Sequence, residues 1–341
     1  MSKALVATPW LLLLVAVCSG AAEPKLTRHS FSAPHMGTTF KIIVYAPDEA
    51  TADRAAKAAF ARVAELDGIM SDYKPASELM RLCAQAGGEP VKVSDDLWTV
   101  LERAQQVARR SDGAFDVTVG PIVRLWRRAR KIHQLPDAED LAQARALVGY
   151  DKVKLDPQAH TVQLTKKGMQ LDLGGIAKGY AADQALLVLK KHGLTRALVA
   201  AGGDIRVGDA PVDADAWTVG ISPVEDPESK PKKYLLLANA AVSTSGDAEQ
   251  YVEIDGKRYS HIVDPKTGLG LVGRMTATVV APDGITSDSL TKVVAVLGPE
   301  KGFPIIEETK GVSGYFVRKT DKGEETFASK HFPEVRQRDE K

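Results

Sequence analysis

Residues Leu171 to Tyr180 read L-D-L-G-G-I-A-K-G-Y, a pattern that predicts a buried strand, a turn with two glycines and then a helix. Glycines at such a turn allow the backbone to approach a ligand closely, because they carry no Cβ atom. The start of the helix directs unpaired N–H groups at the same place, which favours an anion such as a phosphate. The segment therefore predicts a phosphate-binding junction.

Four other segments combine small residues with hydroxyl or carboxylate side chains, and we expect each of them to be a loop. They are M-G-T at 36–38, G-G-D at 202–204, S-T-S-G-D at 243–247 and S-H-I-V-D-P at 260–265. The sequence contains no P-loop, no G-x-G-x-x-G fingerprint after a strand, no H-E-x-x-H and no C-x-x-C. We expect the five segments to form one site that uses none of these standard motifs.

Five aspartates accompany these glycines and hydroxyls. They are Asp172, Asp204, Asp247, Asp264 and Asp288. Carboxylate, hydroxyl and carbonyl oxygens are hard ligands that suit Mg²⁺ holding a diphosphate. For any single aspartate, the alternative is a helix cap or a turn, since this residue favours both positions.

His261 is the best candidate for a general base in the chain. It follows a predicted strand and precedes Asp264, and an imidazole titrates near neutral pH. The alternative is a structural histidine. The hydroxyl groups of residues 243–245 either bind phosphate oxygens or make turns, and the sequence leaves both roles open.

Length and composition indicate a folded protein. The 341 residues suffice for one large domain or two ordinary ones, and 44% are hydrophobic. The net charge of +1 argues against a nucleic-acid surface, which needs a clear basic excess. The densest basic cluster lies within residues 124–131, and we interpret it as a solvated helix face, with a docking patch as the alternative.

The first 22 residues have the features of a secretory signal. Lys3 precedes an apolar run at 10–17, and small residues follow it. The alternative is a lipoprotein signal that ends before Cys18, which would tether the protein to the inner membrane. After removal of the signal Cys83 is the only cysteine, and we expect it to be a packed small residue rather than a catalytic one.

Hydrophobic periodicity and turn residues predict an α+β fold with mixed antiparallel sheets and packed helices, because helices and strands do not alternate steadily. Helices are expected from Thr51, after the N-cap Ser94, over 176–192, and from the N-cap Ser287 to Gly298. Strands or hairpins are expected at 40–45, 152–164, 196–201, 217–222, 234–239, 251–261 and 274–281, with a surface excursion at 131–140. We expect residues 329–341 to form a charged, mobile tail.

Taken in order, seven motifs resemble those of the ApbE family of FAD:protein FMN transferases. They are M-G-T at 36–38, S-D-Y at 71–73, G-A-F-D-V-T at 113–118, L-D-L-G-G-I-A-K-G-Y at 171–180, G-G-D at 202–204, S-T-S-G at 243–246 and S-H-I-V-D-P at 260–265. The resemblance runs from about residue 28 to about residue 320 and implies a single catalytic region over 28–328 with a T-fold-like architecture.

The resemblance also implies an activity and a setting. Members are exported to the bacterial periplasm, often as lipoproteins, and use Mg²⁺ to cleave FAD. They attach FMN through a phosphoester to a Thr or Ser hydroxyl of flavoprotein subunits of membrane electron-transfer complexes, and AMP leaves. Nucleic acid is not among the expected partners.

Carried over position by position, the resemblance makes His261 the base that deprotonates the incoming hydroxyl. Contacts to FAD are implied for Met36, Tyr73, Ala114, Phe115, Asp116, Asp172, Lys178 and Ile262. Mg²⁺ is implied near the Gly175 carbonyl and Asp288.

The sequence departs from the family at the implied metal site. The family commonly has a metal-binding Thr four residues after the aspartate of the last helix, where this chain has Lys292. Thr291 lies one residue earlier and shares a helix face with Asp288, so its hydroxyl is one candidate ligand. The alternative is that the Lys292 ammonium supplies positive charge itself. A smaller departure is Cys83, where the family often has Asn.

Two other functions remain open from the sequence. With water in place of the protein hydroxyl, the same site would hydrolyse FAD to FMN and AMP. A non-catalytic exported flavin-binding protein is the third reading, although binding alone requires neither His261 nor Asp288.

Overall fold

A computed structural model describes residues 25–224, 231–246 and 250–337 of the chain. The expected signal over residues 1–22, Cys18 within it, and Asp247 lie outside the described residues. None of the helices in these ranges combines the length and apolar character that crossing a bilayer requires.

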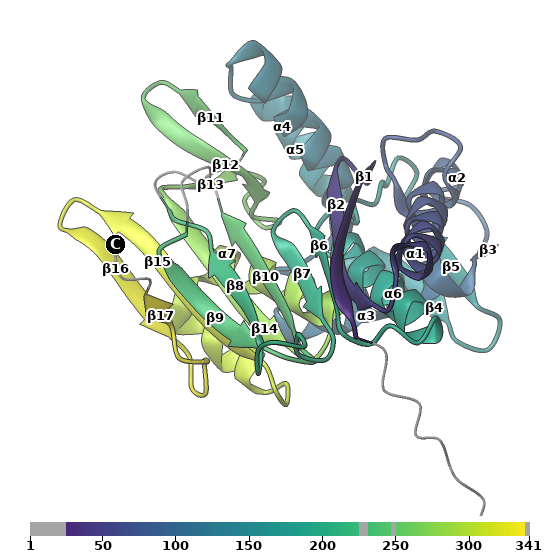
Figure 1. Ribbon diagram of the computed structural model, residues 1–341. Helices are drawn as coiled ribbons and strands as arrows, with labels where there is room; N and C mark the ends of the chain where they lie inside the picture. The colour runs from purple at the N-terminus through teal and green to yellow at the C-terminus, as the bar shows by residue number, and fades with distance from the viewer. Residues whose placement is uncertain (1–24, 225–230, 247–249, 338–341) are drawn as a thin grey trace, which may run out of the picture.

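An antiparallel sheet of eight strands forms the centre of the fold (Figure 1). In spatial order its strands are β1 (Thr27–His35), β2 (Thr38–Ala46), β6 (Ala197–Ala201), β7 (Asp204–Val207), β10 (Ala241–Gly246), β14 (Met275–Ala281), β15 (Ser313–Thr320) and β16 (Gly323–Ala328). Every pairing in it is antiparallel, which confirms the predicted fold class.

Three small antiparallel sheets accompany the large one. The first contains β8 (Trp217–Ile221), β9 (Lys233–Leu237) and β17 (Arg336–Gln337). The second contains β11 (Tyr251–Ile254), β12 (Lys257–Val263) and β13 (Gly270–Val272). The third contains β3 (Val91–Lys92), β4 (Val153–Asp156) and β5 (Thr161–Leu164), so the predicted hairpins at 152–164 and 251–261 are confirmed.

Helices occupy the intervals that periodicity predicted, with additions. They are α1 (Glu49–Met70), α2 (Glu78–Ala84), α3 (Asp95–Arg110), α4 (Gly120–Ile132), α5 (Ala138–Leu147), α6 (Ala177–Lys191) and α7 (Gly284–Glu307), with the short 3₁₀ turns η1 (Val117–Val119) and η2 (Tyr150–Lys152). The predicted cap of α3 is confirmed, because the Ser94 hydroxyl accepts a hydrogen bond from the Leu97 N–H at 3.3 Å.

Alternation along the strands divides the interior into two cores on opposite faces of the large sheet. In β2, Phe40, Ile42 and Val44 pack in the core beneath the helices, while Tyr45 joins the core shared with β8 and β9. This follows from the period of two in a strand. A third core joins α4 and α5 to the β11–β12 hairpin, and Figure 1 shows these elements together at one end of the molecule.

The predicted start of the last helix is wrong, whereas the predicted break at Gly298 is confirmed. Asp283 caps α7 by accepting from the Thr286 N–H at 3.0 Å, so Ser287 lies inside the helix. At Gly298 the backbone leaves the helical conformation with φ 73°, so the first helical segment of α7 ends there, and a second segment follows up to Glu307. The hydroxyl-rich sequence around Ser287 resembles a cap, but its hydroxyl bonds to β10 instead, as described below.

Several segments expected as loops belong to regular elements. S-T-S-G at 243–246 forms β10 and S-H-I-V at 260–263 ends β12, because both pair along their length with neighbouring strands or turns. The expected excursion at 131–140 instead contains the end of α4 and the start of α5. The expected mobile tail over 329–341 is wrong for residues 332–337, because residues 336–337 pair with β9 and Phe332 stacks on Tyr315, and residues 338–341 lie outside the described residues.

The L-D-L-G-G-I-A-K-G-Y segment at 171–180 is an irregular stretch followed by the start of α6, and it contains no strand. Leu171 and Leu173 are buried as expected, but residues 171–173 do not belong to a strand. The Leu171 N–H donates to the Cys83 sulfur at 3.3 Å, and the Asp172 N–H donates to the Val117 carbonyl at 2.8 Å. Cys83 is buried and free, and this contact explains how a cysteine serves at that position.

Helices α6 and α7 cross at two glycines. A Cβ atom on Gly179 would lie 2.0 Å from the Gly284 carbonyl oxygen and 2.7 Å from the Cβ atom of Asp288. No side chain fits between the helices at this point, so only glycine permits the crossing. The third glycine of the L-D-L-G-G-I-A-K-G-Y segment is therefore a packing residue.

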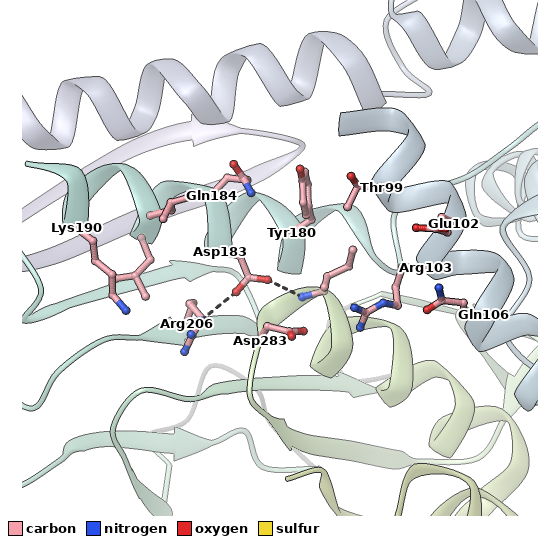
Figure 2. A pocket seen from close by; sticks show the side chains of 13 residues that line it. Thr99, Glu102, Arg103, Gln106, Tyr180, Asp183, Gln184, Lys190, Arg206 and Asp283 are labelled. Carbon is pink, nitrogen blue, oxygen red and sulfur yellow. Dashed lines mark hydrogen bonds and ion pairs between the residues drawn. The ribbon is translucent and has the colours of Figure 1, made fainter. Parts of the chain in front are cut away.

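Asp183, one turn further along α6, also stabilises the contact between α6 and α7. Its carboxylate accepts from the Gly284 and Ile285 N–H groups at 2.8 and 3.0 Å and pairs with Arg206 at 3.0 Å. Figure 2 shows the ion pair between Asp183 and Arg206, and both residues line a surface hollow of about 370 Å³ beside α3. None of the predicted site residues lines this hollow, so it is separate from the candidate site.

Replacing Gly179 tests the crossing. We expect Gly179→Ala to lower the free energy of unfolding by about 1–3 kcal/mol or to prevent folding, because the new methyl group overlaps the Gly284 carbonyl. The matched control is Gly68→Ala in α1, where nothing lies within 4 Å of the added Cβ. Urea unfolding followed by circular dichroism measures both. Equal stability of the two variants would contradict the argument.

Candidate active site

Asp288 lies at the centre of the candidate site, on the turn of α7 that faces the start of α6. It is fully buried. Its Oδ2 accepts from the Gly179 N–H at 3.0 Å, and its Oδ1 pairs with the Lys292 ammonium at 2.5 Å. Burial alone would raise the pKa of Asp288, but the Lys178 and Lys292 ammonium groups outweigh it and hold the pKa below its ordinary value. The carboxyl group is therefore ionised.

Lys178 is the common neighbour of three carboxylates. Its Nζ lies 3.1 Å from an oxygen of Asp204 and 4.0 Å from Asp288, and donates to the Gly174 carbonyl at 2.8 Å. Burial would lower its pKa, but Asp204, Asp288 and then Asp172 raise it above the ordinary lysine value. The ammonium is permanently charged at the start of α6, where the sequence analysis expected a phosphate.

Asp204 begins β7, directly after the Gly202-Gly203 turn. A Cβ atom on Gly203 would lie 2.6 Å from the Thr244 carbonyl, so the turn packs tightly against β10. The second oxygen of Asp204, Oδ1, is buried and has no hydrogen-bond partner within the described ranges. Such an unsatisfied acceptor is uncommon in a folded protein and is typical of a functional site.

The hydroxyls of β10 bind α7 rather than a turn. Ser243 Oγ lies 2.8 Å from Ser287 Oγ, and Ser245 Oγ lies 3.1 Å from Thr291 Oγ1. Two residues on one face of strand β10, two positions apart, thus contact two residues on one face of helix α7, four positions apart. All four side chains are buried, and residues 243–245 lie in a strand rather than in the turn that the sequence allowed as one alternative.

His261 lies near the end of β12 and is partly buried. Its Nδ1 lies 3.1 Å from the Gln250 carbonyl, which can only accept, so Nδ1 carries the proton and Nε2 presents a lone pair. Burial, opposed by the Gln250 bond and strengthened by Lys292, Arg130 and Lys178, lowers the pKa of His261 from 6.5 to about 4. The imidazole is therefore neutral near pH 7, as a general base must be.

Arg127 is a site residue that the sequence analysis missed. It was assigned to a solvated helix face, but its guanidinium binds Asp72 at 2.5 Å and Asp172 at 2.9 Å. It also lies 4.2 Å from the ring centre of Tyr73, which is 70% exposed. The only sign in the sequence that Arg127 belongs to the site is its helical spacing, since Arg127 and Arg130 are three residues apart and lie on the same face of the helix.

The exposed arginines of α4 behave as expected. Arg124, Arg128 and Lys131 face solvent, whereas Arg130 donates to the Gln250 side chain at 3.1 Å. The basic cluster is therefore divided between a solvated face and the candidate site.

Asp172 is largely buried beside Arg127. Burial raises the pKa of this carboxyl, with a further contribution from Asp72, while Arg127 and the Gly174 N–H oppose the rise. Its Oδ1 accepts from the Gly174 N–H at 2.8 Å, which shapes the paired-glycine turn. The carboxylate therefore connects the turn to the exposed ring of Tyr73.

The remaining predicted FAD contacts occupy neighbouring elements. Phe115 is buried and its ring lies 3.4 Å from the position of a Cβ atom on Gly175. Ala114 is buried beside it in the sequence, and Ile262 is buried next to His261. Met36 lies in the β1–β2 turn with φ 49° and lines a shallow hollow there.

Asp116 has a structural partner of its own. Its Oδ1 accepts from the N–H and the hydroxyl of Thr118 at 2.8 and 2.7 Å, which caps η1. Burial raises the pKa of this carboxyl, although the Thr118 bonds oppose it. Asp116 therefore has the helix-cap role that the sequence allowed for a single aspartate.

The residues around Asp288 do not fit a Mg²⁺ ion as they are arranged. The Lys292 ammonium holds one carboxylate oxygen and the Gly179 N–H holds the other. The Thr291 hydroxyl donates to the Asp288 backbone carbonyl at 2.6 Å, accepts from Lys292 Nζ at 3.3 Å and lies 3.1 Å from Ser245 Oγ, so it is already engaged. No three His, Cys, Asp or Glu side chains gather closely enough to hold a metal in the part of the chain that the structure describes.

Comparison with known proteins identifies the family. The model of the ApbE family matches residues 36–316. A Klebsiella pneumoniae (strain 342) protein named FAD:protein FMN transferase is 33% identical over 85% of this chain and 89% of its own length. One of the same name from Treponema pallidum (strain Nichols) is 34% identical over 89% of this chain and 87% of its own.

Solved structures agree with the sequence matches. The flavin transferase ApbE from Vibrio cholerae superposes with a TM-score of 0.80 at 30% identity, covering 90% of this chain and 98% of that one. The apo form of the Pseudomonas stutzeri flavinyl transferase ApbE gives 0.78 at 30% identity, covering 89% and 95%. The chain belongs to the ApbE family. The recognition made from seven motifs is confirmed, and so is the expected enzyme class, flavin transferase.

Removing Arg127 tests its place between two carboxylates. We expect Arg127→Leu to lower the free energy of unfolding by roughly 1–3 kcal/mol at pH 7, because Asp72 and Asp172 lose their shared counter-ion. The loss shrinks as the pH falls, because the folded state, with its raised Asp172 pKa, binds protons more readily than the unfolded chain. The control is the exposed Arg128→Leu. A pH-independent loss in urea titrations would contradict the assignment.

Proposed function

We propose that this flavin transferase moves FMN from FAD to a Thr or Ser hydroxyl of a target protein. The hydroxyl oxygen attacks the phosphorus of the FMN moiety, and the bond from that phosphorus to the bridging oxygen breaks. AMP leaves with the bridging oxygen, and the hydroxyl proton goes to His261. The product is a protein–FMN phosphoester, and the atoms balance without a further reactant.

The observation that carries this proposal is the state of His261. Its Nδ1–H is fixed by the Gln250 carbonyl, so Nε2 is the free acceptor. Its low pKa, about 4, keeps it neutral beside Lys178 and Lys292, the two ammonium groups that face the pair of glycines. A neutral base next to fixed positive charge suits removal of a proton from an alcohol that attacks an anionic phosphoryl group.

Different residues are proposed to bind the diphosphate and the ring systems of FAD. Lys178, held at the start of α6, supports placing the diphosphate there. Tyr73, which is exposed and backed by Arg127, and Phe115, which is buried against Gly175, support flat contacts with the ring systems. Magnesium stays a prediction from the family resemblance, and none of these steps depends on it.

The setting of the reaction rests on the sequence. The signal pattern at residues 1–22 supports export to a bacterial periplasm, and Cys18 supports lipid attachment to the inner membrane as the alternative to a free form. Flavoprotein subunits of membrane electron-transfer complexes are the proposed targets, because the resemblance implies them.

Mass spectrometry tests the transfer. We expect a target flavoprotein subunit incubated with FAD, MgCl₂ and this protein to gain the mass of one FMN on a Thr or Ser, with one AMP released for each. His261→Ala should slow the transfer by about 10²- to 10⁴-fold, because the hydroxyl loses its base. The control is the exposed His192→Ala on α6, which should not change the rate.

Omitting the target separates the alternatives. AMP and free FMN formed at the same rate without a target would favour hydrolysis. Tight FAD binding with no AMP under any condition would favour a flavin-binding protein. An unchanged rate in His261→Ala would remove that residue from the role of base.

The pH dependence tests the lowered pKa of His261. Since the base must be unprotonated, the apparent kcat/KM for FAD falls only as the pH passes below the pKa. We expect the rate to stay level down to about pH 5, because burial and the nearby cations hold the pKa of His261 at about 4. Circular dichroism at each pH checks that the fold persists. An acid limb at the ordinary histidine value of 6.5 would contradict the expectation.

A further inference from the structure

We propose that the Lys292 ammonium takes the place of a divalent cation beside Asp288, and that this chain handles the FAD diphosphate without a metal ion at that position. The proposal rests on the proposed function, since it assigns the residue that neutralises the diphosphate in that reaction. It follows from the disagreement between the implied Mg²⁺ and the residues that surround Asp288.

The first argument is the occupation of Asp288. Its Oδ1 lies 2.5 Å from Lys292 Nζ, and its Oδ2 accepts from Gly179 N–H with Lys178 Nζ 4.0 Å away. A metal ion bound to this carboxylate would lie within a few ångströms of two ammonium groups. Charges of the same sign so close together repel strongly in a buried setting. The carboxylate is already neutralised by the protein.

The second argument is the path of the Lys292 side chain. Its Cγ and Cε lie 3.4 and 3.3 Å from the position of a Cβ atom on Gly175. The stem therefore packs over the glycine whose carbonyl the resemblance implies as a metal ligand, and the ammonium reaches the implied carboxylate ligand. Lys292 spans both ligand positions. The side chain is only 17% exposed, so the stem is held in place.

The Thr291 hydroxyl is also occupied by neighbouring protein groups. It donates to the Asp288 backbone carbonyl at 2.6 Å and lies 3.1 Å from Ser245 Oγ. It also accepts from Lys292 Nζ at 3.3 Å, so protein groups engage both its proton and its lone pairs. Thr291 therefore does not supply the hydroxyl that the family has one residue later.

A merely structural ion pair is the competing explanation. Exposed i, i+4 pairs between an aspartate and a lysine contribute only a few tenths of a kcal/mol to a helix. Here the Asp288 carboxylate is fully buried and faces a second lysine, Lys178, across its other oxygen. Because Lys178 also pairs with Asp204 at 3.1 Å, two ammonium groups and two buried carboxylates form one network at the place proposed for the diphosphate, which an isolated structural ion pair would not require.

Metal binding is the first test, because it does not depend on activity. MnCl₂ titrated into the FAD-free protein and followed by electron paramagnetic resonance should show no ion bound at the site in the wild type. Lys292→Thr should bind one Mn²⁺, because it frees Asp288 and restores a hydroxyl. Asp288→Asn combined with Lys292→Thr should lose that ion. One Mn²⁺ bound by the wild type and lost in Asp288→Asn would overturn the proposal.

Transfer of FMN is the second test. In EDTA the wild type should keep its rate, whereas Lys292→Thr should fall by about 10²-fold and recover when MgCl₂ is added. Lys292→Met should fall equally and not recover, because it offers neither charge nor hydroxyl. The matched control is the exposed Lys301→Thr on α7, which should behave as the wild type. Loss of wild-type activity in EDTA with recovery in MgCl₂ would overturn the proposal.

The two tests separate the proposal from the proposed function. If no variant transfers FMN in any metal condition, the proposed function fails, and the Mn²⁺ titration still decides whether Lys292 excludes a cation. If transfer occurs but requires a metal in the wild type, the proposed function stands and the role of Lys292 is wrong.

Discussion

The close approach of α6 and α7 at Gly179 and Gly284 is the constraint on which the site depends. The N–H of Gly179 is one of the unpaired donors in the first turn of α6, and Ile176 at the N-cap position has no side chain that can accept from it. Asp288 on α7 provides the acceptor. This is possible only because neither glycine has a Cβ atom. The contact that packs the two helices together therefore also places the Asp288 carboxylate at the start of α6, where the phosphate is proposed to bind.

The charges around that contact show why the site is organised for a ligand rather than for stability alone. Lys178 faces Asp204 and Asp288, and one oxygen of Asp204 is buried without a hydrogen-bond partner among the described residues. An unsatisfied buried acceptor lowers stability by about 1–3 kcal/mol. The structure retains this unfavourable group. Burial and nearby cations also keep His261 neutral. Such an arrangement is typical of residues prepared for a substrate.

Part of this organisation was readable from the sequence, and the reason for each failure is physical. The α6 helix and the hairpins follow local rules, because periodicity and the Asp255-Gly256 turn determine them. The strand expected at 171–173 failed because its backbone bonds to Cys83 and to the Val117 carbonyl, which lie far away in the chain. Arg127 was missed for the same reason: its carboxylate partners come from two other segments, and spacing alone does not reveal them.

The helical register of α7 supports the proposed role of Lys292 beside Asp288. Ser287 and Thr291 are four residues apart and both contact hydroxyl groups of β10, so this face of α7 packs against the large sheet. Asp288 and Lys292 form the next stripe, rotated by one residue towards the start of α6. A threonine at 291 and a threonine at 292 are therefore not interchangeable, although the two positions adjoin in the sequence. Because the β10 contacts fix the rotation of α7, the residue that reaches the Asp288 carboxylate in this chain is a lysine.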